Sequence, residues 1–552
     1  MPRPLRASES VREVVAFGLL VVGFAVIADL RRDFMLFPSG LGLRTAIAVT
    51  PLLCLFAVQR IVLSRTAAFL LSLLPWVALG EANAMKFRVT GEPLLWTDLS
   101  TVANLSVLWH YVGPHHLVGL AIGLGLAGWV VRADGVRRPS PPRVAATGAA
   151  LLVAAPIMLH PYLDCVAPTI ARRMQVALAA HDVIYDPWDW TRNARRNGLS
   201  IHLIQTSRRE VPDPPTPVER RRYASLRGRH TPVNPMPRTV MVILCESCWN
   251  DAQRFPRMFD PLVARGLVPF RAISPAYGGG TVNATFELLT GLPARGALTG
   301  VIYQEYAGLL RDEAEALPRA LGRRGYATLD AHNHYRRFWK RDVVNPKLGF
   351  DHFLSLEEMA YTGPGWADDR VLFDAVAARL QPESGLTFSF LTTVFGHGGY
   401  RADDDLGEGV YAARITRSVT ALAEFIDQLL RIDPSALLLV LGDHKPGLTE
   451  YFVAQGLLPR DVTSAPWDVV GDVPGFVRHP DARTAAAFAA RANGMPFFCV
   501  STLLDEAFIG VDHVPFAFAR EIGACARRPD GAYDALVRRY PDFLYSLSLL
   551  ER

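Results

Sequence analysis

The sequence predicts a protein of two parts: a helical membrane domain followed by an α/β domain with a mostly parallel central sheet. Three observations lead to this prediction. The chain has 552 residues, more than one ordinary domain needs, and 50% of them are hydrophobic, which is high for a purely soluble protein. Five apolar stretches follow one another before residue 165. Beyond residue 236, apolar runs of strand length alternate with segments typical of helices.

The membrane domain is predicted over 1–165, with about five helices. The apolar stretches run roughly over 14–30, 43–63, 66–83, 116–132 and 144–162. The first three keep only 15 uncharged residues between flanking charges, fewer than the ~20 of a typical span. Arginines at their ends, such as Arg60 and Arg65, can reach the membrane surface and lengthen the span. A buried soluble helical domain is the alternative.

Charge is unevenly placed along the chain. Residues 1–160 hold 14 Lys/Arg and 8 Asp/Glu, and the remainder holds 44 and 45. The excess lies in the membrane-proximal part, so we expect no nucleic-acid partner. Arginines near the N-terminus, in 59–66 and in 132–143 favour a cytoplasmic position for these segments, although Arg31 and Arg32 oppose it. Five spans would then place the rest of the chain outside a bacterial cytoplasmic (inner) membrane, on the periplasmic or extracellular side.

The remaining segments are divided by composition. Residues 166–236 are predicted as amphipathic helices and a linker, because REVPDPPTPVERRR is rich in proline and charge. A catalytic α/β domain is expected over 237–515, and no role is assigned to the tail 516–552. Its buried strands are predicted at TVMVILCE (239–246), LTFSFLTTVFGH (386–397) and ALLLVLGDH (436–444), with helices between them, for example 313–325 and 411–431.

Polar side chains end each of these three strands. Glu246 ends the first, His397 ends the second, and Asp443 and His444 end the third. Ligands bind beyond the carboxyl ends of strands in open α/β sheets, so these groups are candidates for one site. Of these, Glu246, Asp443 and His444 would bind one divalent metal together with the hydroxyl of Thr281. Oxygen donors favour Mn²⁺, our first expectation, or Mg²⁺, and the imidazole also permits Zn²⁺.

Thr281 lies where the glycine-rich turn of YGGGTVNATFELLTGLP (277–293) meets an apolar helical pattern. It is either a simple N-cap or a nucleophile at a helix N-terminus. A P-loop is excluded because no lysine follows the glycines. A bound metal would lower the pKa of the hydroxyl, and the helix N-terminus would favour the developing negative charge. The glycines would let a phosphoryl group approach the backbone.

The six cysteines show no spacing typical of a disulfide scaffold or a zinc ribbon. Cys499 and Cys525 can pair only if their compartment is oxidising. Cys245 and Cys248 form a C-x-x-C after a strand, which a redox motif would also show. Strand alternation gives Cys245 a simpler interpretation, as a small core residue.

Several motifs together resemble a known family. VILCESCW, GGGTVNATFELLTGLP, NHYRRFWKRDVVNPKLGFDHF, GWADDRVLFD, TTVFGHGGY and LGDHKPG resemble, in this order, motifs of lipoteichoic acid synthases and of bacterial phosphoglycerol transferases acting on periplasmic glucans. Both groups belong to the alkaline phosphatase/sulfatase superfamily. The likeness covers about residues 237–510, and the five-span part with NAMKFRVTGEPLLWTDL is also similar. The resemblance implies an alkaline phosphatase-like (sulfatase-like) α/β domain after the transmembrane helices.

The resemblance also implies roles for single residues. Thr281 matches the nucleophile, and Glu246, Asp443 and His444 match the metal ligands, with Thr281 completing the shell. His397 would protonate a leaving oxygen or hold the transferred group, and we count it as both a catalytic and a substrate-binding candidate.

Headgroup binding is implied for Trp339, Arg341 and His397. Arg341 would pair with phosphate oxygens, and Trp339 would form a wall beside the glycerol. His334 is a further substrate-binding candidate, although the Gram-positive synthases tend to carry an acidic residue there. Cys248 also departs from the pattern, because small or polar residues are commoner at its position.

These features predict a membrane-anchored, metal-dependent phosphotransferase. It would move phosphoglycerol from a phospholipid, phosphatidylglycerol first, to a hydroxyl of a glycan or a polyol-phosphate polymer through a covalent threonine intermediate. A phosphoethanolamine transferase of the same superfamily is the first alternative, and the few cysteines disfavour it. A sulfatase is disfavoured because GGGTVNATF lacks C/S-x-P-x-R. A non-catalytic membrane protein that binds glycan, and a membrane redox protein, are alternatives from other classes.

Overall fold

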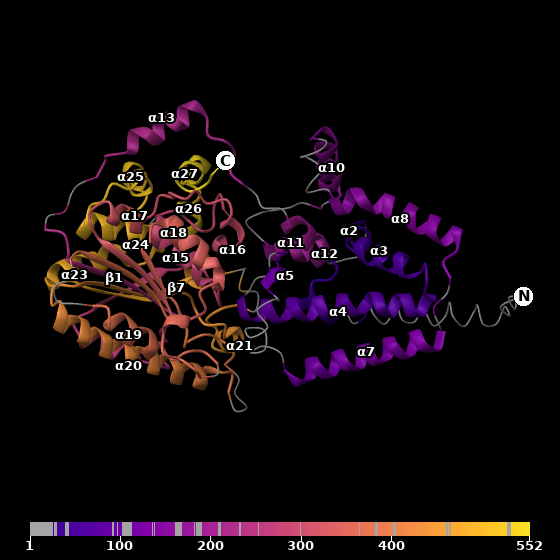
Figure 1. The fold of residues 1–552 in the computed structure, drawn as a ribbon, viewed down its shortest axis with the longest axis horizontal. Helices are drawn as coiled ribbons and strands as arrows, with labels where there is room; N and C mark the ends of the chain where they lie inside the picture. The colour runs from indigo at the N-terminus through magenta and orange to yellow at the C-terminus, as the bar shows by residue number, and fades with distance from the viewer. Residues whose placement is uncertain are drawn as a thin grey trace, which may run out of the picture. The chain divides into compact units, whose positions relative to one another are not determined.

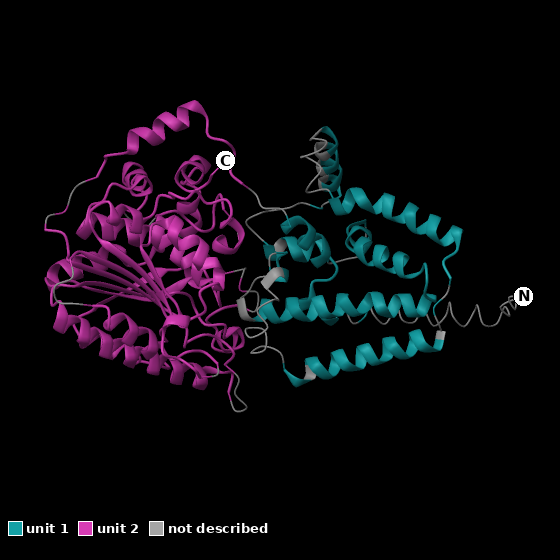
Figure 2. Ribbon diagram, viewed as in Figure 1, with its two compact units in different colours: residues 1–209 teal, residues 210–552 magenta. Residues whose placement is uncertain are grey.

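The computed structural model of the chain divides into two compact units, residues 1–209 and 210–552 (Figure 2). It describes residue 26 and residues 30–38, 43–101, 113–159, 168–207 and 211–551, apart from short gaps inside these ranges. The boundary between the units falls at the start of the segment rich in proline and charge.

Unit 1 is helical in the residues that are described. Its elements are η1 (Arg32–Phe34), α2 (Leu43–Ala48), α3 (Thr50–Gln59), α4 (Arg65–Thr90), α5 (Asp98–Thr101), α7 (Pro114–Asp134), α8 (Pro141–Leu159), α10 (Pro168–Ala180), α11 (Trp190–Asn197) and α12 (Leu199–Thr206). Three described segments are long and apolar enough to cross a membrane: Arg65–Arg88, His116–Ala133 and Pro141–Leu159. Only 11% of the latter two is buried, which suits contact with lipid.

The predicted count of five spans stays a prediction. The stretch 14–30 lies outside the described residues except for its residues 26 and 30. The stretch 43–63 forms α2 and α3, each too short to span a membrane alone. Pro51 at the start of α3 lacks a backbone N–H, so it suits the first turn of a new helix better than the middle of a continuous one.

Unit 2 is built on an eight-stranded sheet of order β4-β3-β5-β1-β6-β7-β2-β8. The strands are β1 (Thr239–Cys245), β2 (Val268–Ile273), β3 (Ala327–His332), β4 (His352–Leu354), β5 (Thr387–Thr392), β6 (Leu437–Gly442), β7 (Asp472–Arg478) and β8 (Met495–Pro496). Only β7 is antiparallel to its neighbours, β6 and β2. The prediction of a mostly parallel sheet is therefore confirmed.

Helices cover both faces of this sheet (Figure 1). They include α13 (Pro217–Leu226), α14 (Asp260–Val263), α15 (Thr281–Thr290), α16 (Ile302–Tyr306), α17 (Leu317–Gly322), η3 (Phe338–Lys340), α18 (Arg341–Leu348), η4 (Leu356–Glu358), α19 (Asp369–Ala377), α20 (Glu408–Ile432), α21 (Thr449–Ala454), α22 (Trp467–Val470), α23 (Ala482–Ala492), α24 (Phe497–Leu504), η6 (Asp505–Ile509), α25 (Val514–Glu521), α26 (Ala532–Val537) and α27 (Asp542–Ser548). The predicted helix 411–431 lies within α20, and 313–325 contains the shorter α17.

Side chains along β1 alternate between the two faces of the sheet, so the strand contributes to two hydrophobic cores. Val240, Val242 and Leu244 pack in the core with α15, α17 and α24, whereas Met241 and Ile243 pack in the core with α19 and α20. Figure 1 shows these helix groups on opposite faces of the sheet. All seven residues of β1 are buried, which explains why the strand appears as a continuous apolar run rather than an alternating one.

The residues after 515 are part of the first of these cores. The hydroxyl of Tyr545 donates to the carbonyl of Pro293 at 2.9 Å, and that of Tyr533 donates to Glu287 at 2.7 Å. Both tyrosines are buried. Residues 516–552 therefore help to hold α15, the helix that begins at Thr281.

Candidate active site

The central strands bring their carboxyl ends to one edge of the sheet. Cys245, the last residue of β1, pairs with Gly442 of β6, and Leu244 pairs with Thr392 of β5. The residues that follow these strands therefore meet, as parallel pairing predicts.

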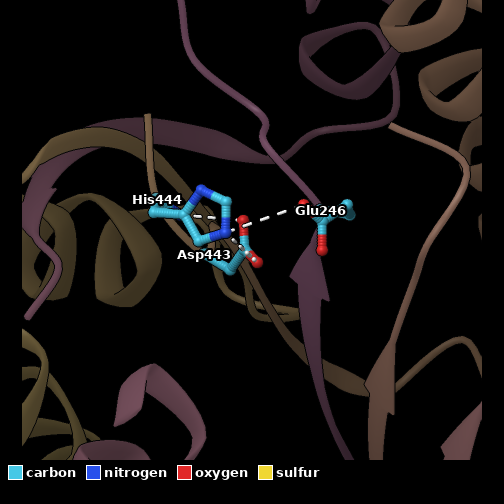
Figure 3. Close-up of side chains that lie close together, drawn as sticks. All are labelled: Glu246, Asp443 and His444. Carbon is cyan, nitrogen blue, oxygen red and sulfur yellow. Dashed lines mark hydrogen bonds and ion pairs between the residues drawn. The ribbon is translucent and has the colours of Figure 1, made fainter. Parts of the chain in front are cut away.

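Glu246, Asp443 and His444 form a buried triad at this edge (Figure 3). Their candidate ligand atoms all lie within 4.8 Å of one another. His444 Nε2 is 3.2 Å from Asp443 Oδ2 and 3.6 Å from Glu246 Oε1. Two carboxylates and an imidazole form a donor set that suits one divalent cation.

The hydrogen bonds of His444 leave one ring nitrogen for a cation. Its Nδ1 lies 2.8 Å from the carbonyl of Lys445, which can only accept, so Nδ1 carries the proton of the neutral ring. Nε2 then holds a lone pair, is buried and has no hydrogen-bond partner among the described residues. A buried ring nitrogen directed at two carboxylates fits a metal ligand oriented by its second nitrogen.

Thr281 joins the triad through its hydroxyl. Its Oγ1 is 2.7 Å from Asp443 Oδ2 and 3.4 Å from Glu246 Oε2. Thr281 is the first residue of α15, after Gly280 in the left-handed conformation at φ 83°. The hydroxyl thus stands at the N-terminus of a buried ten-residue helix, where backbone N–H groups and the helix dipole favour negative charge.

Electrostatics in the triad favour a bound cation. Burial raises the pKa of Glu246 well above its usual range, and the neighbouring Asp443 raises it further. Hydrogen bonds from Ser247 and Thr281 oppose this shift only in part. A divalent cation would offset both the burial and the repulsion, because it stabilises the charged carboxylates.

The headgroup candidates form a second group of side chains around β3. Arg341 is fully buried, and its Nη1 lies 3.5 Å from Asp330 Oδ2, which also accepts from the side-chain amide of Asn345 at 2.6 Å. The other two guanidinium nitrogens of Arg341 have no hydrogen-bond partner among the described residues. A buried guanidinium with free donors is suited to an anion such as a phosphate.

Trp339 and Lys340 precede Arg341 in an unusual backbone conformation. Their φ angles are 56° and 52°, in the left-handed region that residues with a Cβ rarely adopt. Trp339 packs beside Phe338 at 5.1 Å between ring centroids, and it contacts the core containing α15. Local strain of this kind is concentrated at functional sites, and here it sets the start of α18, where Arg341 lies.

Aromatic rings connect His334 and His397, the other two substrate-binding candidates. His334 stacks on Phe338 with centroids 4.1 Å apart, and Trp366 lies 5.7 Å from His334 and 4.3 Å from His397. His332, the last residue of β3, stacks at 5.8 Å from His334. Burial lowers the pKa of His332, and the charge of Arg341 lowers it further.

Asp369 fixes the loops that carry these rings. Its Oδ1 accepts from the backbone of Val394 at 3.0 Å and of Phe395 at 3.1 Å, and from the side chain of Asn333 at 2.9 Å. Its Oδ2 accepts from Ser418. One buried carboxylate therefore holds the segment before His397 against the segment before His334.

The structure thus brings Glu246, Thr281, Asp443 and His444 into direct contact, and it places His334, Trp339, Arg341 and His397 in the neighbouring group. Sequence reasoning did not single out His332, Asp330, Asp369 or Trp366. Trp366 and Asp369 lie inside the motif GWADDRVLFD, which was the only available signal for them.

The cysteine pairing includes the anticipated pair Cys499–Cys525, but it differs from the expectation that Cys245 is a simple core residue. The structure contains two disulfides, Cys245–Cys248 and Cys499–Cys525. Cys245 is a core residue as expected, with 2% exposure, but its sulfur is bonded rather than free. Among the described residues, Cys54 is the free cysteine.

Comparison with known proteins gives a family match for the α/β domain. Residues 239–507 match the family model described as Sulfatase. A protein of Rhizobium meliloti (strain 1021) named for cyclic beta-1,2-glucan modification is 28% identical over 303 residues, which cover 49% of this chain and 46% of the relative. The capsular polysaccharide biosynthesis protein RkpI of the same organism is 24% identical over 36% of this chain and 41% of its own length. The chain covers less than half the length of each of these curated relatives.

Solved structures with similar folds include a synthase and two transferases by name. The lipoteichoic acid synthase LtaP from Listeria monocytogenes matches at a TM-score of 0.40 and 17% identity, covering 53% of this chain and 80% of that one. The Streptococcus pyogenes phosphoglycerol transferase GacH, in complex with sn-glycerol-1-phosphate, matches at a TM-score of 0.45 and 16% identity. The match covers 61% of this chain and 96% of that one. The lipooligosaccharide phosphoethanolamine transferase EptA from Neisseria meningitidis matches at a TM-score of 0.49 and 14% identity. The match covers 84% of this chain and 91% of that one.

The family match covers the strands that hold the triad, from the start of β1 to beyond β8. The order of motifs and the mostly parallel sheet agree with it. Residues 239–507 are therefore similar in sequence to the Sulfatase family.

Proposed function

We propose that the chain is a membrane-anchored, metal-dependent phosphotransferase that moves a phosphoglycerol group from a phospholipid to a glycan hydroxyl. The observation that carries this proposal is the contact of the Thr281 hydroxyl with Asp443 at 2.7 Å, inside a buried triad of two carboxylates and an imidazole. A hydroxyl in that position has the surroundings that a nucleophile needs.

Glu246, Asp443 and His444 would hold one divalent cation, with the Thr281 hydroxyl as a fourth ligand. We favour Mn²⁺ over Mg²⁺ and Zn²⁺, because three of these four donors are oxygens and one is an imidazole. The bound cation would lower the pKa of the hydroxyl and offset charge on the phosphoryl oxygens.

In the first half of the reaction, Thr281 Oγ1, having released its proton to solvent, forms a bond to the phosphorus of the lipid headgroup. The bond from phosphorus to the diacylglycerol oxygen breaks, and His397 is the candidate to protonate that oxygen as it leaves. The two free guanidinium nitrogens of Arg341 support a role in binding phosphate oxygens. Trp339, His334 and Trp366 would enclose the glycerol.

In the second half, an acceptor hydroxyl attacks the phosphorus and gives its proton to His397, and the bond to Thr281 breaks, which restores the free enzyme. The names of the two curated relatives concern a cyclic glucan and a capsular polysaccharide. They support a glycan as the acceptor over a polyol-phosphate polymer.

The apolar helices of unit 1 support a multi-pass anchor in a bacterial cytoplasmic (inner) membrane. We propose that unit 2 lies on the periplasmic or extracellular side, in line with the distribution of arginines. A tether to the membrane keeps the site near a lipid donor at high local concentration.

The test is mass spectrometry of the purified chain after incubation with vesicles of phosphatidylglycerol or of phosphatidylethanolamine. We expect a glycerophosphate adduct on the peptide containing Thr281 with the first lipid and none with the second. An ethanolamine-phosphate adduct would instead identify the phosphoethanolamine transferase alternative. Diacylglycerol release that persists at the wild-type rate in Thr281→Ala would overturn the proposal.

A further inference from the structure

Residues 245–248 form a turn whose two ends are joined by a disulfide and by a backbone hydrogen bond. The disulfide Cys245–Cys248 joins its ends, and the N–H of Cys248 donates to the carbonyl of Cys245 at 3.2 Å. That same carbonyl also accepts from the N–H of Asp443 at 3.1 Å. The turn therefore connects the end of β1 to the residue that follows β6.

The two residues enclosed by this ring act directly on the triad. Glu246 is itself a candidate metal ligand, and its Oε1 accepts from the hydroxyl of Ser247 at 2.8 Å. The N–H of Ser247 donates to Asp443 Oδ1 at 2.6 Å. A single turn thus sets the orientation of both carboxylates.

The turn has a conformation that requires support. Ser247 has φ 56°, in the left-handed region, which is unfavourable for a residue with a Cβ. The carboxylates of Glu246 and Asp443 are buried side by side, so they repel each other when both are charged. Both effects favour a change in the turn that would separate the two carboxylates.

Two glycines leave this turn little space on either side. A Cβ added to Gly442 would lie 1.9 Å from the carbonyl oxygen of Cys248, and one added to Gly396 would lie 2.2 Å from that of Glu246. The turn therefore occupies the space that a side chain at either glycine would fill.

We propose that the Cys245–Cys248 disulfide is a positioning element of the metal site, which holds Glu246 and Asp443 ready to bind a divalent cation. The inference rests on the metal site of the proposed function. Cys245 and Cys248 are only 2% and 1% exposed, so their sulfurs are closed to a substrate thiol, unlike those of a catalytic dithiol. The crosslink has a positioning role rather than a redox activity toward substrates.

The crosslink also makes cation binding depend on whether the chain folds in an oxidising compartment. Its formation takes two electrons and two protons from two thiols, and a protein or small-molecule disulfide that is reduced to two thiols can accept them. Such oxidants act outside the reducing cytosol. A chain that keeps both thiols has a looser turn and binds the cation more weakly.

The chain provides a matched control for the test. Cys245→Ala/Cys248→Ala removes the crosslink in the turn. Cys499→Ala/Cys525→Ala removes the other disulfide of the same unit, whose cysteines lie in the core that contains α15 and α24. Mn²⁺ binding to the purified full chain is measured by isothermal titration calorimetry. We expect the first variant to raise the Kd about 10–100-fold, the usual effect of losing a group that orients metal ligands. The control variant should bind like the wild type.

Thermal unfolding of each variant shows whether it is folded, and Cys248→Ala alone serves if the double variant does not fold. An unchanged Kd for Mn²⁺ in a folded variant without the crosslink would overturn this inference and leave the proposed function in place. If the wild-type chain itself bound no Mn²⁺, the proposed metal-dependent function would fail first, and the inference with it.

Discussion

Asp443 bonds differently through its two carboxylate oxygens. Oδ1 accepts from the backbone N–H of Ser247 at 2.6 Å and of His444 at 2.8 Å, whereas Oδ2 accepts from the hydroxyl of Thr281 at 2.7 Å. Two backbone donors therefore fix the carboxylate, and its second oxygen is left for the hydroxyl and a cation. The side chain links the turn after β1, the turn after β6 and the start of α15.

Loss of the Thr281 hydroxyl should abolish group transfer. We expect Thr281→Ala to lower the rate of diacylglycerol release by at least roughly 10³-fold, in the range seen when a nucleophile is removed, and Thr281→Ser to retain part of it. Thr285→Ala is the control, since Thr285 lies one turn later on α15 and its hydroxyl donates to the carbonyl of Thr281, at 3.1 Å. Equal losses in Thr281→Ala and Thr285→Ala would mean that helix packing, rather than the nucleophile, sets the rate.

Metal removal should destabilise unit 2. Without a cation, two buried carboxylates face each other, whereas a cation at about 100 times its Kd adds ~2.7 kcal/mol to folding stability. We expect a chelator to lower the melting temperature by on the order of 5 °C, and added Mn²⁺ to restore it, as measured by scanning calorimetry. Asp443→Asn should not respond to Mn²⁺. Identical melting of the wild type with chelator and with Mn²⁺ would contradict a metal site here.

Arg341 and Asp330 allow stability to be separated from binding. Arg341→Ala leaves the buried carboxylate of Asp330 without its cation, which should cost about 3–5 kcal/mol in urea unfolding. We expect Arg341→Ala/Asp330→Ala to recover much of this loss, because no unpaired charge is left. Phosphotransfer should not recover, because the phosphate ligand is still missing. If activity returned together with stability, Arg341 would have a structural role only.

The carboxyl of Glu287 should make stability depend on pH. Burial raises its pKa to about 8, against an ordinary value of 4.5, so the folded chain binds more protons than the unfolded chain between these values. Stability contributed by this proton should therefore fall as the pH rises from 4.5 to about 8, by at most about 1.4 kcal/mol per pH unit.

Substitution isolates this effect. Glu287→Gln stays neutral and should lose this part of the pH dependence in thermal unfolding, whereas Glu313→Gln, at an exposed position, should keep it. An unchanged pH profile in Glu287→Gln would show that the carboxyl is already ionised in the folded chain.

The sequence predicts best the strands that are buried on both faces. β1, β5 and β6 were expected because their apolar runs are continuous and bounded by polar residues. β7 was not, since Pro474 and Gly475 lie inside it and both are unusual within a strand. It is antiparallel to both neighbours, and pairing direction leaves no mark in composition.

The candidate site likewise combines residues that the sequence predicts with residues that it does not. Glu246, Asp443 and His444 follow apolar strands, so parallel pairing alone predicts that they meet. Trp366 and Asp369 act through a ring contact and through hydrogen bonds to loops, which depend on three-dimensional packing. The pairing of Cys245 with Cys248 likewise depends on the shape of a turn. A C-x-x-C spacing permits a bond without requiring it.

The packing of α15 depends on α26 and α27, which are synthesised after it. Glu287, in its last turn, and Pro293, just after its end, bond to Tyr533 and Tyr545, which are synthesised much later than α15. The helix that begins with Thr281 therefore lacks part of its packing until these two tyrosines have been synthesised. A premature stop codon ahead of Tyr533 would yield a polypeptide containing every residue of the triad but without the partners of α15. We expect quality-control proteases to remove it.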